Sequence, residues 1–226
     1  MPKISDFETQ ELSNTALAFA TLEVLHFPLI SAISAAARTT ISEFAEQELS
    51  NTAWSFARLE VFDGTLLTSI SAAALNKMPD FGVQGLSNTA WAFAKLLFND
   101  PPLLTAISAA SIRRSYEFVP QGLTNLAWSI ATWGICDFPL LDALAAASIR
   151  KLNHFNPQDC FMIAWSWCVM SLLDSGSAGG NARNHRKALR LTGCRFPEVS
   201  SKAVGVDYVE FANGVWSVWR GASQKK

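Results

Sequence analysis

The stretch that decides the fold is Gln84-Gly85-Leu86-Ser87-Asn88-Thr89-Ala90-Trp91-Ala92-Phe93-Ala94. It recurs with few changes at Leu12–Leu17, Leu49–Trp54 and Leu123–Trp128. The asparagines of the four copies stand at positions 14, 51, 88 and 125, so each follows the previous one by 37 residues. Self-similarity at a fixed period of this length is typical of a stacked repeat protein.

Each repeat contains two helical patterns. In the second copy, Leu49, Ala53 and Phe56 have the i, i+4, i+7 spacing of an amphipathic helix. A break at residues 62–64 separates it from a second helical stretch over residues 66–75. No stretch of the chain has the pattern of a strand. We therefore expect an all-α fold, an α-solenoid of stacked helix–turn–helix repeats with a period of 37.

The repeats are expected to occupy residues 7–174 as about four and a half helical hairpins. The fifth copy is degenerate around Met162-Ile163-Ala164-Trp165. Residues 175–206 are expected to form a Gly/Ser-rich loop and a basic insertion. The motif returns at Phe211–Trp219, which predicts a partial degenerate repeat and a tail over residues 207–226.

The composition narrows the class of protein. Half of the residues are hydrophobic and 16% are charged, which argues against disorder. No apolar run is long enough to span a bilayer, so we expect no membrane partner. The net charge is −1, but the first two repeats are acidic, whereas residues 155–226 carry nine Lys and Arg against five Asp and Glu.

The cysteines and the N-terminal sequence bear on location. Four cysteines without a CxxC pair indicate reduced thiols in an intracellular compartment. The N-terminal residues match neither a signal peptide nor a transit peptide. We expect either that the protein needs no such address or that the chain is a piece of a longer array.

The sequence contains few signs of catalysis. The Gly-rich segment 176–180 lacks the Lys-Ser/Thr of a P-loop and follows no strand. No His, Cys and Asp residues have the spacing of a metal site. We expect no enzyme activity, no cofactor, no metal and no small-molecule substrate.

Two repeated residue types have competing interpretations. Tryptophan recurs at positions 54, 91, 128 and 165, either as a platform on which bases stack or as a packing element between repeats. We favour packing, because the first copy has Leu17 instead. The repeated asparagines either contact a ligand or bond backbone groups of the adjacent repeat. We favour the backbone role, since a residue that reads a varied sequence should itself vary.

Polar residues that change between repeats define a predicted outer stripe on the first helix of each hairpin. Aligned stripes would form a continuous binding surface or an ordinary solvated face, and the sequence leaves both open. In the second, third and fourth repeats the stripe comprises Glu48, Asn51, Ser55 and Arg58; Gly85, Asn88, Ala92 and Lys95; and Gly122, Asn125, Ser129 and Thr132.

Basic pairs end the second helix of two repeats, at Arg113-Arg114 and Arg150-Lys151. They have two interpretations, phosphate contact and complementing the helix macrodipole. The candidate RNA-binding residues are Asn51, Ser55, Arg58, Asn88, Lys95, Arg113, Arg114, Asn125, Ser129, Arg150 and Lys151.

The repeat resembles a known family. Its pattern is clearest in Phe118–Ala131 followed by Pro139-Leu140-Leu141, which resembles the octotricopeptide repeat family and the leucine-rich helical repeats of FAST-kinase-type proteins. The resemblance covers residues 7–174 and, more weakly, 207–219. It implies an α-solenoid that binds single-stranded RNA in a mitochondrion or chloroplast and acts in transcript stability, processing or translation.

The sequence thus favours a non-catalytic RNA-binding solenoid, with RNA on the outer stripe and the basic C-terminal third. The alternative is a protein-interaction scaffold of the same shape, which would bind an extended peptide or a helix. The acidic N-terminal half favours the scaffold, and the basic C-terminal segment favours RNA.

Overall fold

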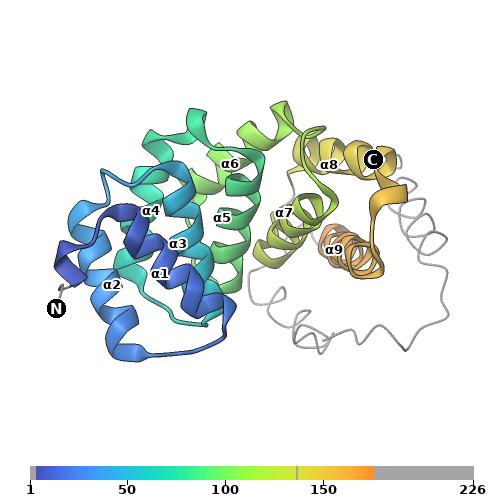
Figure 1. Cartoon of the computed structure of the whole chain (residues 1–226). Helices are drawn as coiled ribbons and strands as arrows, with labels where there is room; N and C mark the ends of the chain where they lie inside the picture. The colour runs from blue at the N-terminus through green and yellow to red at the C-terminus, as the bar shows by residue number, and fades with distance from the viewer. Residues whose placement is uncertain (1–3, 136, 176–226) are drawn as a thin grey trace. The chain divides into compact units, whose positions relative to one another are not determined.

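The computed structural model describes residues 4–135 and 137–175. Over these residues the chain is helical and contains no strand (Figure 1). The α-helices are α1 (Thr9–Thr21), α2 (Phe27–Thr40), α3 (Glu46–Arg58), α4 (Gly64–Asn76), α5 (Val83–Lys95), α6 (Pro101–Arg113), α7 (Pro120–Trp133), α8 (Phe138–Arg150) and α9 (Pro157–Ser175). Short 3-10 turns are formed by η1 (Ile4–Asp6), η2 (Met78–Asp80) and η3 (Leu152–His154).

Within each compact unit, first and second helices of the hairpins alternate along the chain. The chain divides into two units after Phe118. In the first unit α1, α3 and α5 pack side by side as first helices of the hairpins, and α2, α4 and α6 pack as second helices (Figure 1). In the second unit α7 packs against α8 and α9. The predicted all-α solenoid of stacked hairpins is confirmed.

The core of each hairpin is built from residues at equivalent positions. The phenylalanine that opens a repeat is at most 1% exposed at Phe44, Phe81 and Phe118. Leucines of the first helix and of the second helix fill the space between the two helices, and they are buried as well. These leucines are Leu12, Leu49, Leu86 and Leu123 in the first helices and Leu66, Leu103 and Leu140 in the second.

The second helix of each hairpin begins at a capping side chain whose position recurs every 37 residues. Asp63, Asp100 and Asp137 each cap it by accepting a hydrogen bond from the backbone N–H three residues later, at 3.0, 3.1 and 3.1 Å. His26 performs the same role in the first repeat through Nδ1. An acceptor at this position satisfies a backbone N–H that has no partner within the helix.

The first helix of each repeat ends in a left-handed residue. Glu23, Glu60, Leu97 and Gly134 have φ values of 56°, 57°, 54° and 67°. In all four, the N–H of the following residue bonds back to the carbonyl five residues earlier, as in a Schellman motif. This turn sends the chain into the second helix.

Replacing Leu97 by glycine should raise the free energy of unfolding by about 1 kcal/mol. Leu97 is 73% exposed, so little packing is lost, and glycine adopts a positive φ without the strain that a Cβ adds. Urea denaturation followed by circular dichroism measures the change. Gly134→Ala is the converse variant, and we expect it to lower stability by a similar amount. A decrease for Leu97→Gly would contradict the account.

The segments predicted beyond the repeats fall largely outside the described residues. The predicted loop and basic insertion at 175–206 lie there, apart from Ser175, which ends α9. The predicted partial repeat and tail at 207–226 also lie there.

Candidate nucleic-acid interface

The face of each first helix opposite its leucine core carries a row of four side chains, spaced i, i+4, i+7 and i+11. Such spacing places the four on one stripe of a helix. We call this stripe the outer row. It comprises Gln10, Asn14, Leu17 and Thr21 in α1; Gln47, Asn51, Trp54 and Arg58 in α3; Gln84, Asn88, Trp91 and Lys95 in α5; and Gln121, Asn125, Trp128 and Thr132 in α7.

The outer row differs from the stripe predicted from the sequence. Ser55 and Ser129 are fully buried, and their hydroxyls donate to the carbonyls of Asn51 and Asn125 within the same helix, at 2.7 and 2.6 Å. Their placement on an open face was therefore wrong. The helix is rotated relative to the predicted orientation. The side of α3 that carries Glu48 faces α1, because Ser13 Oγ of α1 donates to Glu48 O at 3.4 Å.

The amides of the outer row have no hydrogen-bond partner within the described residues. We expected the asparagines to bond backbone groups of the adjacent repeat, and residues 4–135 and 137–175 contain no such bond. Asn14 is exposed, and Asn51, Asn88 and Asn125 are partly exposed. The prediction of a backbone role was wrong, because these side chains keep contact with solvent instead of being buried against the adjacent repeat.

The sequence analysis missed the glutamines of the outer row. Gln10, Gln47, Gln84 and Gln121 are all exposed and lie four residues before the asparagines. The signal was present, since the glutamines recur with the same 37-residue step and continue to Gln158. Each of the first four repeats therefore presents two neighbouring amides.

The two predicted cations of the outer row are engaged in ion pairs. Arg58 Nη2 pairs with Glu23, and Lys95 Nζ lies 2.9 Å from Glu60 Oε1. Each glutamate occupies the left-handed residue that ends the preceding first helix. Because both pairs are partly exposed, their contribution to stability is small, about 0–1 kcal/mol. They do neutralise the positive charge of the row in the first unit.

The cations at the ends of the second helices divide into two groups. Arg114 Nη1 donates to Phe81 O at 2.7 Å, and Lys77 Nζ at the equivalent position donates to Phe44 O and Ser42 O. These side chains tie the end of a repeat's second helix to the phenylalanine that opens the same repeat. Arg113 and Arg150 are exposed instead, and Lys151 is partly exposed.

Two tryptophans of the outer row meet between neighbouring helices. The rings of Trp54 and Trp91 are 6.3 Å apart between centroids and tilted by 33°. Trp91 is 8% exposed, whereas Trp54, Trp128 and Trp165 are partly exposed. The contact between α3 and α5 supports the packing interpretation for this pair.

A family model for the RNA-editing substrate-binding complex 6 protein matches residues 3–174. The chain belongs to this family. No curated protein matches the chain. The matched range contains every helix from α1 to α8 and all of α9 except Ser175, so the match covers the described repeats. The resemblance to the octotricopeptide repeat family and to FAST-kinase-type repeats stays a prediction.

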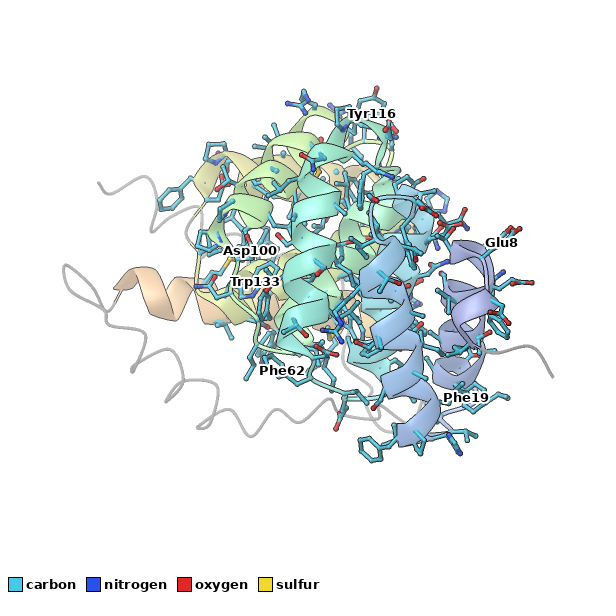
Figure 2. All side chains as sticks on the ribbon, turned by 90° about the vertical axis from the view of Figure 1, so that its left-hand side faces the viewer. Glu8, Phe19, Phe62, Asp100, Tyr116 and Trp133 are labelled. Carbon is cyan, nitrogen blue, oxygen red and sulfur yellow. The ribbon has the colours of Figure 1, made fainter. Side chains whose placement is uncertain are left out.

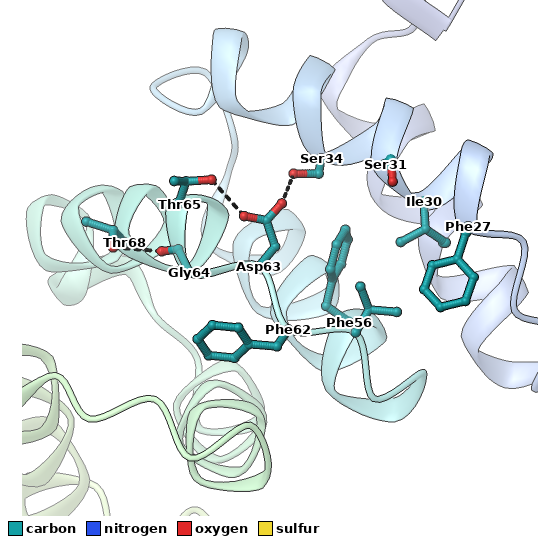
Figure 3. A pocket seen from close by; sticks show the side chains of 11 residues that line it. Phe27, Ile30, Ser31, Ser34, Phe56, Phe62, Asp63, Gly64, Thr65 and Thr68 are labelled. Atoms are coloured by element: carbon teal, nitrogen blue, oxygen red, sulfur yellow. Dashed lines mark hydrogen bonds between the residues drawn. The ribbon is translucent and has the colours of Figure 1, made fainter.

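Within the family's repeats, the described residues contain a groove between α2 and α4 with a volume of about 770 Å³ (Figure 3). Its polar centre is Asp63, which accepts hydrogen bonds from Ser34 Oγ and, at 2.7 Å, from Thr65 Oγ1. Partial burial opposes ionisation, but these bonds, the bond from Leu66 N and the charge of Arg38 lower the pKa of Asp63. The polar groups satisfy one another, so the groove is explained as part of the hairpin structure.

Replacing Asp63 by alanine should lower the free energy of unfolding by about 1–2 kcal/mol at pH 7, because the N-cap of α4 is lost. The folded-state pKa lies below the ordinary value of 3.8. The contribution is therefore complete above that value and disappears as the pH falls through the lowered folded-state pKa. Thermal melts of both proteins between pH 2 and 7 measure it. A difference between the two proteins that stays constant over this range would contradict the ionised cap.

The remaining chemistry of the described residues is sparse. They contain no group of His, Cys, Asp and Glu that would hold a metal ion, and no helix with the length and hydropathy of a membrane span. Cys160 is a free, buried thiol in α9, and burial together with the neighbouring Asp159 raises its pKa. Such a thiol is packed rather than activated.

Proposed function

We propose that this protein is a non-catalytic RNA-binding solenoid that acts in RNA processing within an RNA-editing type of assembly. The observation that carries the proposal is the match of the RNA-editing substrate-binding complex 6 family to residues 3–174. The outer row supports it, because helical repeats bind polymers along the surface formed by their aligned helices. We further propose that the ligand is single-stranded and that the protein works in a mitochondrion or chloroplast.

Filter binding tests the proposal. The full chain is titrated against a labelled pool of random single-stranded RNA at low salt, with a double-stranded RNA of equal length as the comparison. We expect saturable binding to the single strands and weaker binding to the duplex. No binding of the single-stranded pool at low salt would overturn the proposed function.

A protein-interaction scaffold is the second candidate, and the ion pairs favour it. Arg58 and Lys95 face glutamates and are not free to meet phosphates. Residues 4–118 carry six Lys and Arg against twelve Asp and Glu, a net charge of −6. RNA, a polyanion, gains little binding free energy from such an acidic surface unless groups other than cations contact the RNA.

Within the part of the chain that the structure describes, the basic residues at the ends of α6 and α8 are further candidates for phosphate contact. Replacing Arg113 and Arg150 together by methionine should weaken RNA binding about two- to fivefold at low salt and reduce its salt dependence, because two phosphate contacts are lost. The same filter assay, repeated at several salt concentrations, measures both quantities. An unchanged salt dependence would show that these side chains do not contact phosphates.

A further inference from the structure

The first unit presents a ladder of identical amides, one rung on each first helix. We call Gln10 and Asn14, Gln47 and Asn51, and Gln84 and Asn88 the amide ladder. The three helices pack in order, and Arg58 and Lys95 reach the preceding repeat at equivalent places, so the rungs stay in register. Packed helices lie about 8–10 Å apart, which sets the spacing of the rungs.

The rungs are available to a ligand. All three glutamines and Asn14 are exposed, while Asn51 and Asn88 are partly exposed, and none of the six has a hydrogen-bond partner within the described part of the chain. Figure 2 shows side chains projecting from α1 along the length between the labelled Glu8 and Phe19. Each amide supplies an acceptor oxygen and two donor hydrogens.

The sameness of the rungs indicates what they recognise. Base-specific readers vary from repeat to repeat, because each faces a different base. The amide ladder does not vary over three repeats. Its ligand must therefore present the same group at each step, and in an RNA strand the repeated groups are the phosphate and the ribose.

Charge decides between the phosphate and the ribose. The cations of the outer row are paired with Glu23 and Glu60, and the first unit is strongly acidic, so phosphates are disfavoured near the ladder. The ribose 2′-hydroxyl is neutral and is both donor and acceptor, which matches an amide. A strand held by its sugars can direct its phosphates toward solvent.

We propose that the amide ladder binds single-stranded RNA through its ribose hydroxyls, independently of sequence. This inference rests on the proposed function. It requires two properties that a cationic surface would not produce. RNA is bound in preference to DNA of the same sequence, and the affinity depends weakly on salt. For single strands the log–log slope is about −0.7 per phosphate contacted, so we expect a slope shallower than about −2.

The experiment compares four proteins, each as the full chain, by fluorescence anisotropy with a 24-nucleotide oligo(U) RNA and the matching oligo(dU) DNA. The ladder variant is Gln47→Ala, Asn51→Ala, Gln84→Ala and Asn88→Ala combined. The control is Asn76→Ala with Asn99→Ala, two exposed amides off the ladder. The fourth protein is Arg113→Met with Arg150→Met. Circular dichroism establishes that each variant is folded. Alanine favours folding at exposed and partly exposed helix positions, because it is the best helix former.

We expect the ladder variant to lose about tenfold or more in RNA affinity and to lose its preference for RNA over DNA. The control should retain both. Equal RNA affinity in the ladder variant and the wild type would overturn the inference. It would favour an extended peptide as the ligand of the amide ladder. Equal wild-type affinity for RNA and DNA would overturn it too. If the wild type binds neither strand, the proposed function itself fails, which is a separate result.

Discussion

Replacing Trp91 by alanine should lower the free energy of unfolding by about 3–5 kcal/mol, the largest effect that we expect of any single change argued for this protein. Trp91 is 8% exposed and its ring contacts Trp54 on the neighbouring first helix. Truncation removes this contact and leaves a cavity at a junction between repeats. Urea denaturation followed by helical circular dichroism measures the loss without depending on tryptophan fluorescence.

Two further variants separate packing from a role in base stacking. Trp91→Phe should lose less stability than Trp91→Ala, because an aromatic ring still fills most of the space. Trp54→Ala should also lose less, since Trp54 is only partly buried. A Trp91→Ala protein with unchanged stability and weakened RNA binding would reverse the interpretation, making the tryptophan a stacking platform.

The period of 37 made the fold predictable from the sequence. Leu49, Ala53 and Phe56 define one helix, and the same spacing recurs in each copy. The helix predicted within one repeat is therefore consistent with the stacking of the repeats. The N-caps at Asp63, Asp100 and Asp137 recur with the same step. Stacking then follows, because a single hairpin cannot bury its apolar face alone.

The exact face that a helix exposes was harder to predict. On α3 the predicted stripe and the outer row share Asn51 and Arg58, but Ser55 is fully buried. A helical wheel identifies the side opposite the leucines, but it does not say how far adjacent repeats cover its flanks. Gly85 illustrates the point: a Cβ there would lie 3.4 Å from Glu46 Oε2 of the preceding first helix.

The state of the cations could not be predicted from the sequence pattern. In the sequence, Arg58 and Lys95 looked available to contact phosphates. Their glutamate partners lie 35 residues earlier, a separation that no helical spacing pattern detects. The pairing depends on the left-handed turn at Glu23 and Glu60, which directs these side chains toward the next repeat. The turn is a local C-cap motif, but the partner that it brings near a side chain depends on how the repeats stack, which composition does not encode.

Arg113 and Arg114 form a matched pair for the second large effect. Replacing Arg114 by methionine should lower the free energy of unfolding by about 1–3 kcal/mol, because the partly buried carbonyl of Phe81 loses its donor. Replacing the exposed Arg113 in the same way should leave stability within about 0.5 kcal/mol of the wild type. Both variants remove one positive charge, so denaturation curves at the same pH and salt isolate the hydrogen bond.

A third variant distinguishes the hydrogen bond from the ion pair with Glu117. Arg114→Lys should retain most of the stability, because Lys77, 37 residues earlier, already bonds the equivalent carbonyl of Phe44. Glu117→Ala removes the partner of Arg114 but leaves the bond to Phe81 O, so it should cost little at this exposed site. If Glu117→Ala costs as much as Arg114→Met, the ion pair rather than the hydrogen bond to Phe81 O accounts for the effect.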